Sequence, residues 1–546
     1  MLVPEFPSAG TIGRLPNDTG AVPHPSRAFR GMGGIAGDRS RSTHPQPRPP
    51  RSLAPSLPRS LLLLLPCSLA PCLLLSACKP VGPNYNRPNY TAPPAYKETG
   101  ASTVVVPPPN PQGGAWQPAN PSDGMLKGKW WQIYQDPQLN QLEDRIDSDN
   151  VQLRQQMELY LAAQSQVRAI RANLFPTLSA GPAISRSRIS ANRPLAQPGS
   201  STTSGDFVIA GQASWEPDFW GRIRRAVEQA RANAQASAAD EANVALTLHA
   251  EMATDYFALR GLDSQIQLLT DTVSDLQNQV DLAEKRFHGG VATEVDVAQA
   301  QTQLETVRAQ LVDLGVARAQ YEHAIGTLAN ESLPGFSIPP SPLTLALPQV
   351  PTGVPSQLLQ RRPDIAQAER LAAAANAQIG INIAAFYPTI TLGGTGGFES
   401  SSPGSWIEGS SSLWSLGAQA SELLFDAGQR HALTDVARHN YEAQADAYRN
   451  TVFQAFNDVE DQLSSLRILE QEAATEQRAV DSARHSFDLS NNRYKGGATS
   501  YLEVLTAEQT LLQNQVTAVN IASRQFAASV SLIRALGGGW DVTQLP

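Results

Sequence analysis

Cysteine is nearly absent from this chain. Only Cys67, Cys72 and Cys78 occur among its 546 residues. The first two lie in a short Leu-rich run with the composition of a cleaved secretory signal, so the mature chain is expected to keep one thiol. A single cysteine excludes a disulfide scaffold and a cysteine-based metal site.

The motifs that mark common enzyme sites are also missing. The chain has no HExxH, GxSxG or GxGxxG pattern. No Lys-Ser or Lys-Thr follows the run GGTGG at Gly393, which favours close strand packing over a phosphate loop. The sequence RRPDI at Arg361 fits a helix start, and His431 and His439 are too far apart on one helix to share a metal ion. We therefore expect no enzyme activity, no cofactor and no metal site.

Clustered basic residues are missing as well. The formal net charge is −8. Eight Arg residues and three acids precede Cys78, which leaves 34 bases and 47 acids after it. A surface that binds nucleic acid needs clustered Lys and Arg, so the sequence disfavours a nucleic-acid partner.

The N-terminal region has the features of an export signal. Residues 1–77 are rich in Pro, Arg and Ser and end in a Leu-rich run and the sequence LSAC, which resembles the lipobox of bacterial lipoproteins. We expect 1–77 to be a leader and lipoprotein signal peptide, and Cys78 to be the lipid-modified N-terminus. Residues 78–128, rich in Pro, Asn and Gly, are expected to form an extended tether. The region before Arg59 is longer than a normal signal, so the true translation start stays open.

The rest of the chain repeats itself at long range. The sequence RFHGGVATEVDVAQAQTQLE from Arg286 is matched 207 residues later by RYKGGATSYLEVLTAEQTLL from Arg493. A second pair of matching stretches, NLFPTLSAG and AFYPTITLGG, lies upstream in the two halves. Collinear copies favour one structure with an internal two-fold repeat, whose halves we place at residues 129–335 and 336–546.

Each half contains two stretches of alternating character, joined by a loop rich in Gly, Pro and Ser. This pattern predicts a pair of strands in each half. A helix is expected before the first pair, with Asp136 and Pro137 as its N-cap and first-turn residue and Pro176 marking its end. The strands are expected at about 177–190, 206–217, 389–399 and 411–424.

Two long segments contain almost no helix breakers. Residues 429–495 have neither Gly nor Pro, and residues 222–288 have only Gly261. A helix of this length spans roughly 100 Å at 1.5 Å per residue. From Leu262 to Phe287 apolar residues recur at alternating spacings of four and three, the pattern of a coiled-coil seam. Because a Gly pair ends each segment before the helical pattern resumes, we expect two helical hairpins with tips near 288–293 and 495–500.

A sheet of four strands cannot stand alone in a membrane, because unpaired N–H and C=O groups at its edges are costly in hydrocarbon. Two copies would supply eight strands, whose barrel is filled by side chains, and three would supply twelve, enough to leave a lumen. The sequence therefore favours a mixed α and β membrane protein. In it, three chains close a 12-stranded barrel and gather six helical hairpins around one axis.

Several motifs match a known family in order along the chain. Cys78 with VGPNYNRP, WWQIYQDPQL from Trp130, the paired FPT and YPT, LLQRRPDIAQAE from Leu358 and the two R-F/Y-x-x-G tips resemble the TolC-like outer-membrane efflux proteins, in their lipoprotein (NodT-type) branch. The resemblance implies a homotrimer in the outer membrane with a long α-helical coiled-coil barrel in the periplasm. It also implies a passive channel that exports small molecules, with a periplasmic membrane-fusion adaptor and an inner-membrane resistance-nodulation-division pump as partners.

The same resemblance assigns roles to residues. The periplasmic gate corresponds to Asp296, Tyr494 and Glu503, with a hydrogen bond between Tyr494 and Asp296 as one expected link. Thr499 and Thr506 stand where some family members place an arginine and a second acid, so fewer links are expected in the closed state. The hairpin tips that dock the adaptor correspond to Arg286, Gly289, Gly290, Arg493, Gly496 and Gly497.

Two other functions stay open at this point. An outer-membrane conduit for polypeptide secretion would have the same architecture. A periplasmic coiled-coil adaptor or structural lipoprotein would share the helical seam but would lack the two matched pairs of amphipathic strands. No residue that we identify encodes the exported compound or the cognate pump and adaptor.

Overall fold

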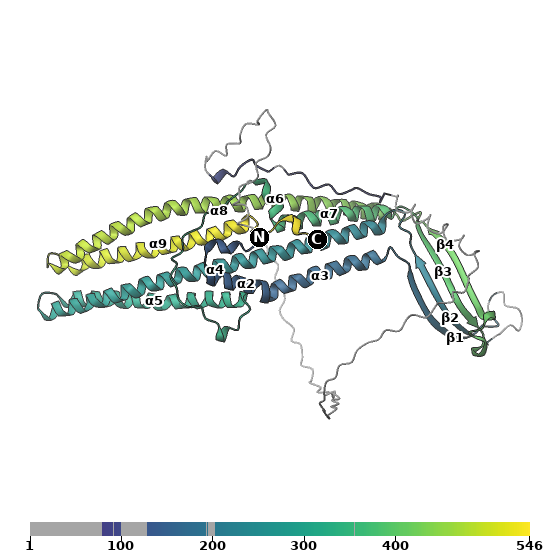
Figure 1. The fold of residues 1–546 in the computed structure, drawn as a ribbon, viewed down its shortest axis with the longest axis horizontal. Helices are drawn as coiled ribbons and strands as arrows, with labels where there is room; N and C mark the ends of the chain where they lie inside the picture. Colours follow the sequence, from purple (N-terminus) through teal and green to yellow (C-terminus); the bar gives the residue numbers. More distant parts are fainter. Residues whose placement is uncertain (1–78, 91, 100–127, 193, 195–202, 354) are drawn as a thin grey trace, which may run out of the picture. The chain divides into compact units, whose positions relative to one another are not determined.

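The computed structural model describes residues 79–90, 92–99, 128–192, 194, 203–353 and 355–546. The chain divides into two units, Met1–Cys67 and Ser68–Pro546, and all described residues belong to the second. The expected leader, Cys78 and most of the expected tether therefore lie outside the described residues. Within the second unit the described residues are mostly helical, with one four-stranded sheet (Figure 1).

The helices and strands occur in two series with the same order. The helices α3 and α7 each have 22 residues, α4 and α8 each have 67, and α5 and α9 each have 35. The α-helices are α2 Pro137–Asp149, α3 Val151–Ala172, α4 Arg222–His288, α5 Glu294–Leu328, α6 Leu358–Arg361, α7 Pro363–Ala384, α8 Gln429–Lys495 and α9 Tyr501–Ala535. The strands are β1 Thr177–Arg188, β2 Thr203–Trp215, β3 Thr389–Ser400 and β4 Ser412–Ser421. The short 3₁₀ helices are η1 Lys97–Thr99, η3 Trp130–Tyr134, η4 Leu333–Gly335, η5 Pro355–Gln357, η6 Pro403–Ser405, η7 Gly409–Ser411 and η8 Val542–Gln544.

The helix expected from Asp136 to Pro176 is in fact two helices. Its N-cap is where the sequence indicates, because the Asp136 carboxylate accepts hydrogen bonds from two backbone N–H groups in the first turn of α2. The break is at Asn150, whose backbone is extended. The Asn150 side chain accepts a hydrogen bond from the Leu153 N–H and donates one to the Leu328 carbonyl, both at 2.9 Å. These two bonds stabilise the non-helical conformation that separates α2 from α3.

The helices α4 and α5 form one antiparallel hairpin, and α8 and α9 form the other (Figure 1). The middle of the expected seam, at Leu269, Leu276, Val280 and Ala283, is buried against side chains of α5, α8 and α9. Phe287 departs from the seam expectation. It lies in the last turn of α4, beyond Ala283, and is 40 % exposed. No helix within the described residues combines the length and the apolar character that crossing a membrane requires.

The four strands form one antiparallel sheet in the order β1-β2-β3-β4. Each half of the chain contributes one pair, β1 with β2 and β3 with β4. The central strands β2 and β3 pair with each other from Phe207, opposite Ser400, to Trp215, opposite Leu392. The sheet therefore joins the two halves. Its edges are β1 and β4, and neither pairs with a further strand among the described residues.

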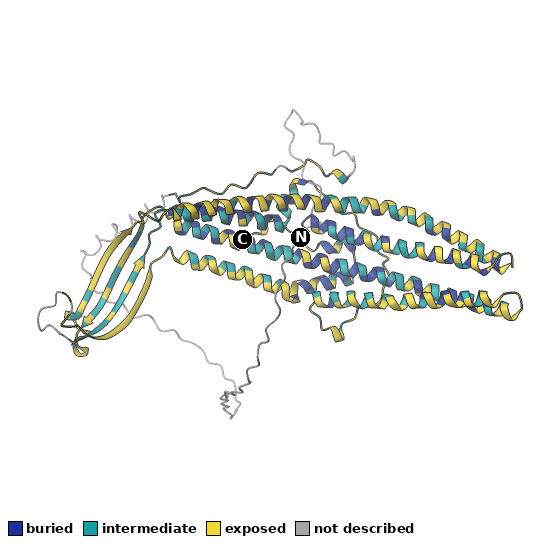
Figure 2. Ribbon diagram, turned by 180° about the vertical axis from the view of Figure 1, so that it is seen from behind, coloured by how far each residue is buried: buried dark blue, intermediate teal, exposed yellow. Residues whose placement is uncertain are grey.

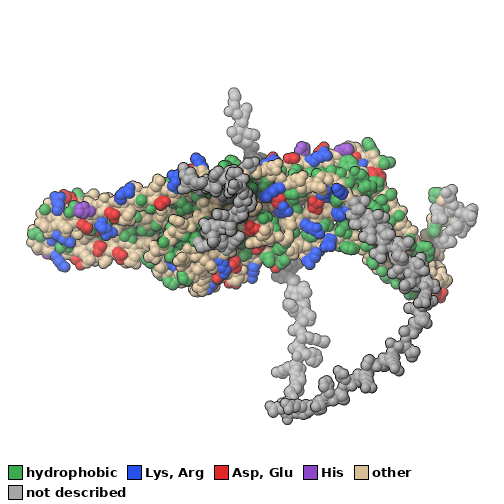
Figure 3. Space-filling view, turned by 45° about the horizontal axis from the view of Figure 1, so that its top comes forward, with side chains coloured by type: hydrophobic (Ala, Val, Ile, Leu, Met, Phe, Trp, Pro, Cys, Tyr) green, Lys and Arg blue, Asp and Glu red, His purple; other side chains and the backbone are tan. Residues whose placement is uncertain are grey.

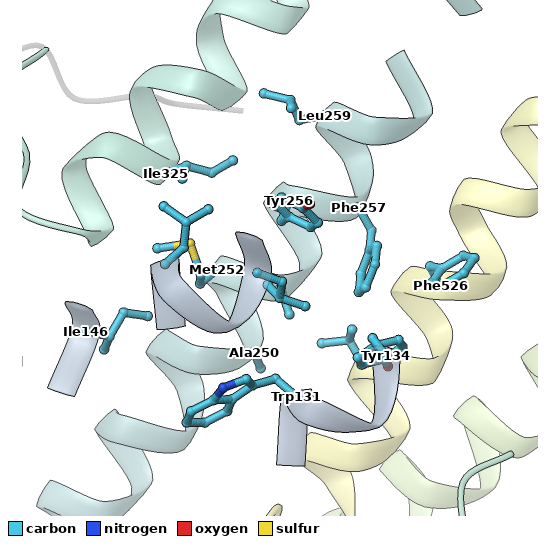
Figure 4. Packing of buried hydrophobic residues seen from close by; sticks show 14 of the residues in the cluster. Trp131, Tyr134, Ile146, Ala250, Met252, Tyr256, Phe257, Leu259, Ile325 and Phe526 are labelled. Atoms are coloured by element: carbon cyan, nitrogen blue, oxygen red, sulfur yellow. The ribbon is translucent and has the colours of Figure 1, made fainter. Parts of the chain in front are cut away.

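A large cluster of buried side chains lies where α2, α4, α9 and η3 meet (Figure 4). The rings of Tyr134, Phe257 and Phe526 are 4.7–6.0 Å apart in pairs, which is the range of favourable aromatic contacts. Burial falls away from this cluster, as Figure 2 shows by the exposed residues over α3 and the outer strands. None of the 22 residues of α3 is buried, so α3 contributes little to the core of its own chain.

Candidate functional site

The two hairpin tips are built in the same way. In the first, Gly290 N–H donates to the Phe287 carbonyl at 2.9 Å, and in the second, Gly497 N–H donates to the Tyr494 carbonyl at 2.9 Å. Gly290 and Gly497 have φ angles of +73° and +72°, a conformation that favours glycine. The preceding glycine of each pair has a negative φ angle. The second glycine of each pair is thus the one that the backbone of the turn requires.

Arg286 connects the two tips. Its Nη1 donates to the Lys495 carbonyl at 3.2 Å, and its guanidinium lies 4.7 Å from the centre of the Tyr494 ring. A cation over an aromatic face is favourable, and more so where water is excluded. Arg493 occupies the equivalent place in the second half but is exposed. The copies are therefore alike in backbone and different in side-chain contacts.

The two candidate gate acids occupy equivalent positions, in the first turns of α5 and α9. The Asp296 carboxylate accepts hydrogen bonds from the Thr293 N–H at 2.9 Å and from the Thr293 hydroxyl at 3.0 Å, which closes a capping box. Glu503 is exposed, and no side-chain cap is formed at the start of α9. One acid is engaged by its own helix, and the other is available to solvent.

The expected hydrogen bond between Tyr494 and Asp296 is not present. Asp296 is engaged by Thr293, and the Tyr494 hydroxyl is buried with no hydrogen-bond partner among the described residues. Burial raises the pKa of Tyr494, Arg286 opposes the rise and the nearby Asp296 charge adds to it. Tyr494 instead packs edge-on against Tyr501, with ring centres 5.5 Å apart.

A polar link that sequence reasoning missed crosses from α9 to α4 near these tyrosines. The Tyr501 hydroxyl donates to Gln279 Oε1 at 3.0 Å, and Gln279 Nε2 donates to Glu508 Oε1 at 2.7 Å. Spacings of three, four and three residues place Glu508 in the buried row of α9 with Tyr501, Val504 and Leu511. The presence of an acid at a position where this row is otherwise apolar is the sequence feature that could have indicated the polar link.

Glu508 is a buried acid with an incomplete set of partners. It is 6 % exposed, and its Oε2 has no hydrogen-bond partner among the described residues. It lines a cavity of about 280 Å³ between α4, α8 and α9, whose wall also carries Asp271, Asp275, Asp488 and Arg484. Burial raises the pKa of Glu508 to about 7, the Gln279 hydrogen bond opposes the rise and the Asp275 charge adds to it.

A second buried charged group joins α2 to α4, away from the tips. His249 contacts Glu143 at 2.7 Å through Nδ1 and Asp147 at 3.1 Å through Nε2, and its ring stacks on Trp131. Burial opposes the charged form of His249, but the hydrogen bonds with Asp147 and Glu143 raise its pKa to about 9. No group of three His, Cys, Asp or Glu side chains suited to a metal ion is found in the described part of the chain. The cluster is best explained as an ion pair that holds the two helices together.

The RRPDI sequence also has a packing role. Helix α7 begins at Pro363, as that sequence indicates. Arg362 pairs with Asp364 at 2.7 Å and with Asp458 of α8 at 3.1 Å, and it donates to the Ala535 carbonyl of α9. It therefore joins the start of α7 to both helices of the second hairpin.

The sheet has two faces of different chemistry, because successive side chains along a strand point to opposite sides. One face, which we call the polar face, carries small and polar residues apart from Val208 and Leu413. Its members are Thr177, Ser179, Gly181, Ala183, Ser185 and Ser187 of β1, Ser204, Asp206, Val208, Ala210, Gln212 and Ser214 of β2, Thr389, Thr391, Gly393, Thr395, Gly397 and Glu399 of β3, and Leu413, Ser415, Gly417, Gln419 and Ser421 of β4.

The opposite face, which we call the apolar face, carries mainly Leu, Ile, Phe, Trp, Ala and Gly. Several of its large side chains are solvent-exposed in the single chain, with Trp414 78 % and Leu416 81 % exposed, whereas Phe207, Trp215 and Phe398 are half-buried. Its members are Leu178, Ala180, Pro182, Ile184, Arg186 and Arg188 of β1, Thr203, Gly205, Phe207, Ile209, Gly211, Ala213 and Trp215 of β2, Ile390, Leu392, Gly394, Gly396, Phe398 and Ser400 of β3, and Ser412, Trp414, Leu416, Ala418 and Ala420 of β4.

The face of the helical part that Figure 3 shows has no such division of surface character. In the view of Figure 3, basic and acidic side chains are interspersed over the helices, and no large region of one sign is visible. A sheet with one polar and one apolar face is the arrangement that separates water from hydrocarbon.

Comparison with known proteins finds the same combination of elements. A family model described as outer membrane efflux protein matches residues 145–331 and 354–538. The chain is 31 % identical over 433 residues to the probable efflux pump outer membrane protein TtgC of Pseudomonas putida, covering 79 % of this chain and 89 % of TtgC. It is 31 % identical over 495 residues to the pyoverdine export outer membrane protein OpmQ of Pseudomonas putida, covering 89 % of this chain and 98 % of OpmQ. The solved structure of the outer-membrane channel OprN is similar with a TM-score of 0.75 and 26 % identity, covering 84 % of this chain and 99 % of OprN.

Glu508→Gln is expected to stabilise the protein at pH 8 and to have a smaller effect at pH 5. With its folded pKa near 7 and an unfolded pKa near 4.3, the carboxyl binds its proton more tightly in the folded state. The favourable contribution of this carboxyl to the free energy of unfolding is therefore fully present below about pH 4.3. It is lost as the pH rises through about 7. Glutamine removes the buried charge, which should be worth roughly 1–3 kcal/mol at pH 8.

The melting temperature of the detergent-solubilised protein, followed by circular dichroism at both pH values, measures this difference. Glu470→Gln on α8 is the matched control, because Glu470 is exposed and the substitution removes the same charge. An equal effect of Glu508→Gln at pH 5 and pH 8 would contradict the assignment of Glu508 as a buried acid that ionises near neutral pH.

Proposed function

Because the chain belongs to the outer membrane efflux protein family, we propose that it is the outer-membrane channel of a tripartite efflux system. In this proposal three copies form a passive conduit for small molecules. A periplasmic membrane-fusion adaptor and an inner-membrane resistance-nodulation-division pump deliver the exported compound. The observation that carries the proposal is the sheet, with its polar face, its apolar face and its two edges, which pair with no further strand among the residues that the structure describes.

The edges β1 and β4 favour a closed assembly of copies. In hydrocarbon, each unpaired backbone group is costly, so β1 of one copy would pair with β4 of the next. Three copies supply twelve strands, the smallest closed set here that is expected to leave a lumen. The residues of the polar face are mostly Gly, Ala, Ser and Thr, whose small side chains would keep such a lumen wide.

The helical part also favours association of copies. Helix α3 has no buried residue, and it exposes Met157 and Leu161 one turn apart. Helix α8 exposes Leu433, Val436 and Phe453. Exposed apolar side chains along a helix favour packing against another surface, and the helices of neighbouring copies would provide it in a homotrimer.

The tips are proposed to form the periplasmic gate and the adaptor-docking end of the channel. Glu503 is an exposed acid at this end, as is Glu294, and three copies would bring three Glu503 carboxylates together. At a separation of about 6 Å, each pair repels by ~0.7 kcal/mol in water. Such a ring favours cations in the pore. Asp296 and Tyr494 would act on the gate through the shape of the tips, since no bond joins them in the single chain.

Lipid attachment at Cys78 is part of the proposal. The LSAC sequence supports it, although Cys78 lies outside the described residues. The mass of the N-terminal peptide of the mature protein tests it, because acylation adds a mass that a free cysteine lacks.

A conduit for secreted polypeptides is the second candidate, and a periplasmic adaptor is the third. The names of the relatives favour small molecules, since OpmQ is described as a pyoverdine export protein and TtgC as part of a probable efflux pump. The two-faced sheet argues against an adaptor. Which compound this chain exports depends on the pump that it serves.

Leu416→Arg is expected to prevent assembly in the outer membrane, and Ser415→Arg is expected to be tolerated. The two residues are neighbours on β4, but Leu416 belongs to the apolar face and Ser415 to the polar face. An arginine facing lipid costs up to roughly 2–4 kcal/mol per copy, and the cost is greatest at the bilayer midplane. The measurement is the amount of heat-modifiable trimer in the outer-membrane fraction, determined on gels for each variant. Equal tolerance of both substitutions, or greater damage from Ser415→Arg, would show that the faces are assigned wrongly.

Glu503→Ala is expected to reduce the preference of the channel for cations, because it removes an exposed acid from the proposed gate. Reversal potentials in planar bilayers under a salt gradient measure this preference. Glu305→Ala serves as the control, since it removes an exposed acid from α5 away from the tip. If Glu503→Ala and the control leave the selectivity equally unchanged, the gate does not lie at Glu503.

A further inference from the structure

The charged residues of the sheet are few, and they gather at one end of it. Asp206 and Glu399 are the only charged residues on the polar face, and Arg186 and Arg188 are the only ones on the apolar face. All four lie near the ends of the strands that are joined by the 189–202 and 401–411 connections. The sheet thus separates the negatively charged side chains from the positively charged ones, with the acids on the polar face and the arginines on the apolar face.

The apolar face places Arg186 and Arg188 just beyond a band bounded by aromatic rings. Trp215 lies on the apolar face at the end of β2 next to the helices, and Phe207 lies eight residues earlier on the same strand. That separation is roughly 27 Å along the strand, or about 20 Å of membrane height at a tilt near 40°. The Phe207 ring packs against Trp406 with ring centres 5.7 Å apart. Aromatic rings at both ends of an apolar band mark the two interfaces of a membrane.

The arginines lie on the headgroup side of this boundary. Phe207 pairs with Ile184, and Arg186 is two residues further along β1 on the same face. Two residues advance a strand by about 7 Å, which takes Arg186 from the aromatic boundary to the depth of lipid headgroups. Its cross-strand neighbour is Gly205, which has no side chain to cover the guanidinium. Arg186 is exposed, and the nearest acids along the strands point from the opposite face.

We propose that Arg186 and Arg188 form a binding site for the phosphate groups of lipid headgroups at the outward rim of the barrel. Arginine suits this ligand, because its planar guanidinium can donate two parallel hydrogen bonds to phosphate oxygens and keeps its charge at every physiological pH. The inference rests on the proposed function, which puts the apolar face against lipid and this end of the sheet outside the cell. Because β1 is an edge strand, the bound lipid would lie at the junction between two copies and would hold them together.

Native mass spectrometry of the detergent-purified trimer tests this site. The probe is lipid A with two phosphates, compared with the same lipid lacking both phosphates. Wild-type trimer is expected to retain the phosphorylated lipid at least about tenfold more tightly than the double variant Arg186→Gln with Arg188→Gln. No such difference is expected for the dephosphorylated lipid. The matched control, Arg438→Gln with Arg478→Gln on α8, removes equal charge from exposed positions and should bind as the wild type does.

Further measurements distinguish failure of the lipid site from failure of the proposed function. Equal retention of both lipids by the wild-type trimer overturns the site without use of any variant. Binding of inorganic phosphate alone that displaces the lipid at equal concentration overturns the assignment to lipid. The variant Arg186→Lys with Arg188→Lys keeps the charge. It should bind phosphorylated lipid A more weakly than the wild type and more tightly than the double glutamine variant. If the wild-type protein inserts and conducts but the glutamine variant retains phosphorylated lipid A equally, only this inference fails. If the wild-type protein does not insert, the proposed function fails with it.

Discussion

The unpaired backbone of β1 and β4 is the constraint on which the rest of the structure depends. Four strands bring together an apolar and a polar face, but within the described part of the chain the sheet ends in two rows of open N–H and C=O groups. Hydrocarbon cannot satisfy those groups, so the apolar face can meet lipid only when another copy closes the edges. The pairing of β2 with β3 already uses both halves of the chain. If the apolar face meets lipid, as the proposed function requires, closure has to come from other chains.

The helical repeats follow from the same requirement. Each of the two hairpins consists of one helix of 67 residues and one helix of 35 residues. Because the two hairpins match in length, six of them from three copies could form a nearly uniform wall around one axis. Their tips are less uniform, since Arg286 covers Tyr494 while Arg493 is exposed. The buried link from Tyr501 through Gln279 to Glu508 joins the two hairpins of one chain near the tips. Burial raises the pKa of Glu508 to about 7, so ionisation of this carboxyl at higher pH destabilises the folded chain at this link.

Helices and strands that follow from local residue periodicity could be predicted from the sequence. Contacts that depend on residues far away in the chain could not. The alternating stretches and the long segments without Gly or Pro predict a mostly helical fold with some strands, and the relatives confirm the family. The break at Asn150 has a local signal, because asparagine is a common N-cap residue, but it also depends on a carbonyl 178 residues away that no local pattern reveals. The Tyr494 to Asp296 bond was expected from a resemblance, whereas the local cap at Thr293 holds Asp296. The burial of Glu508 is decided by the packing of α4 and α8 around it, which no single segment reveals.

The number of copies in the membrane tests the central claim most directly. Native mass spectrometry of the protein extracted intact from the outer membrane gives that number without any substitution. The edge constraint and the small residues of the polar face predict three copies, which is twelve strands. A complex of two copies would close an eight-stranded barrel with a filled interior, and a single copy would leave both edges open. Either result would contradict the account of the chain as a channel.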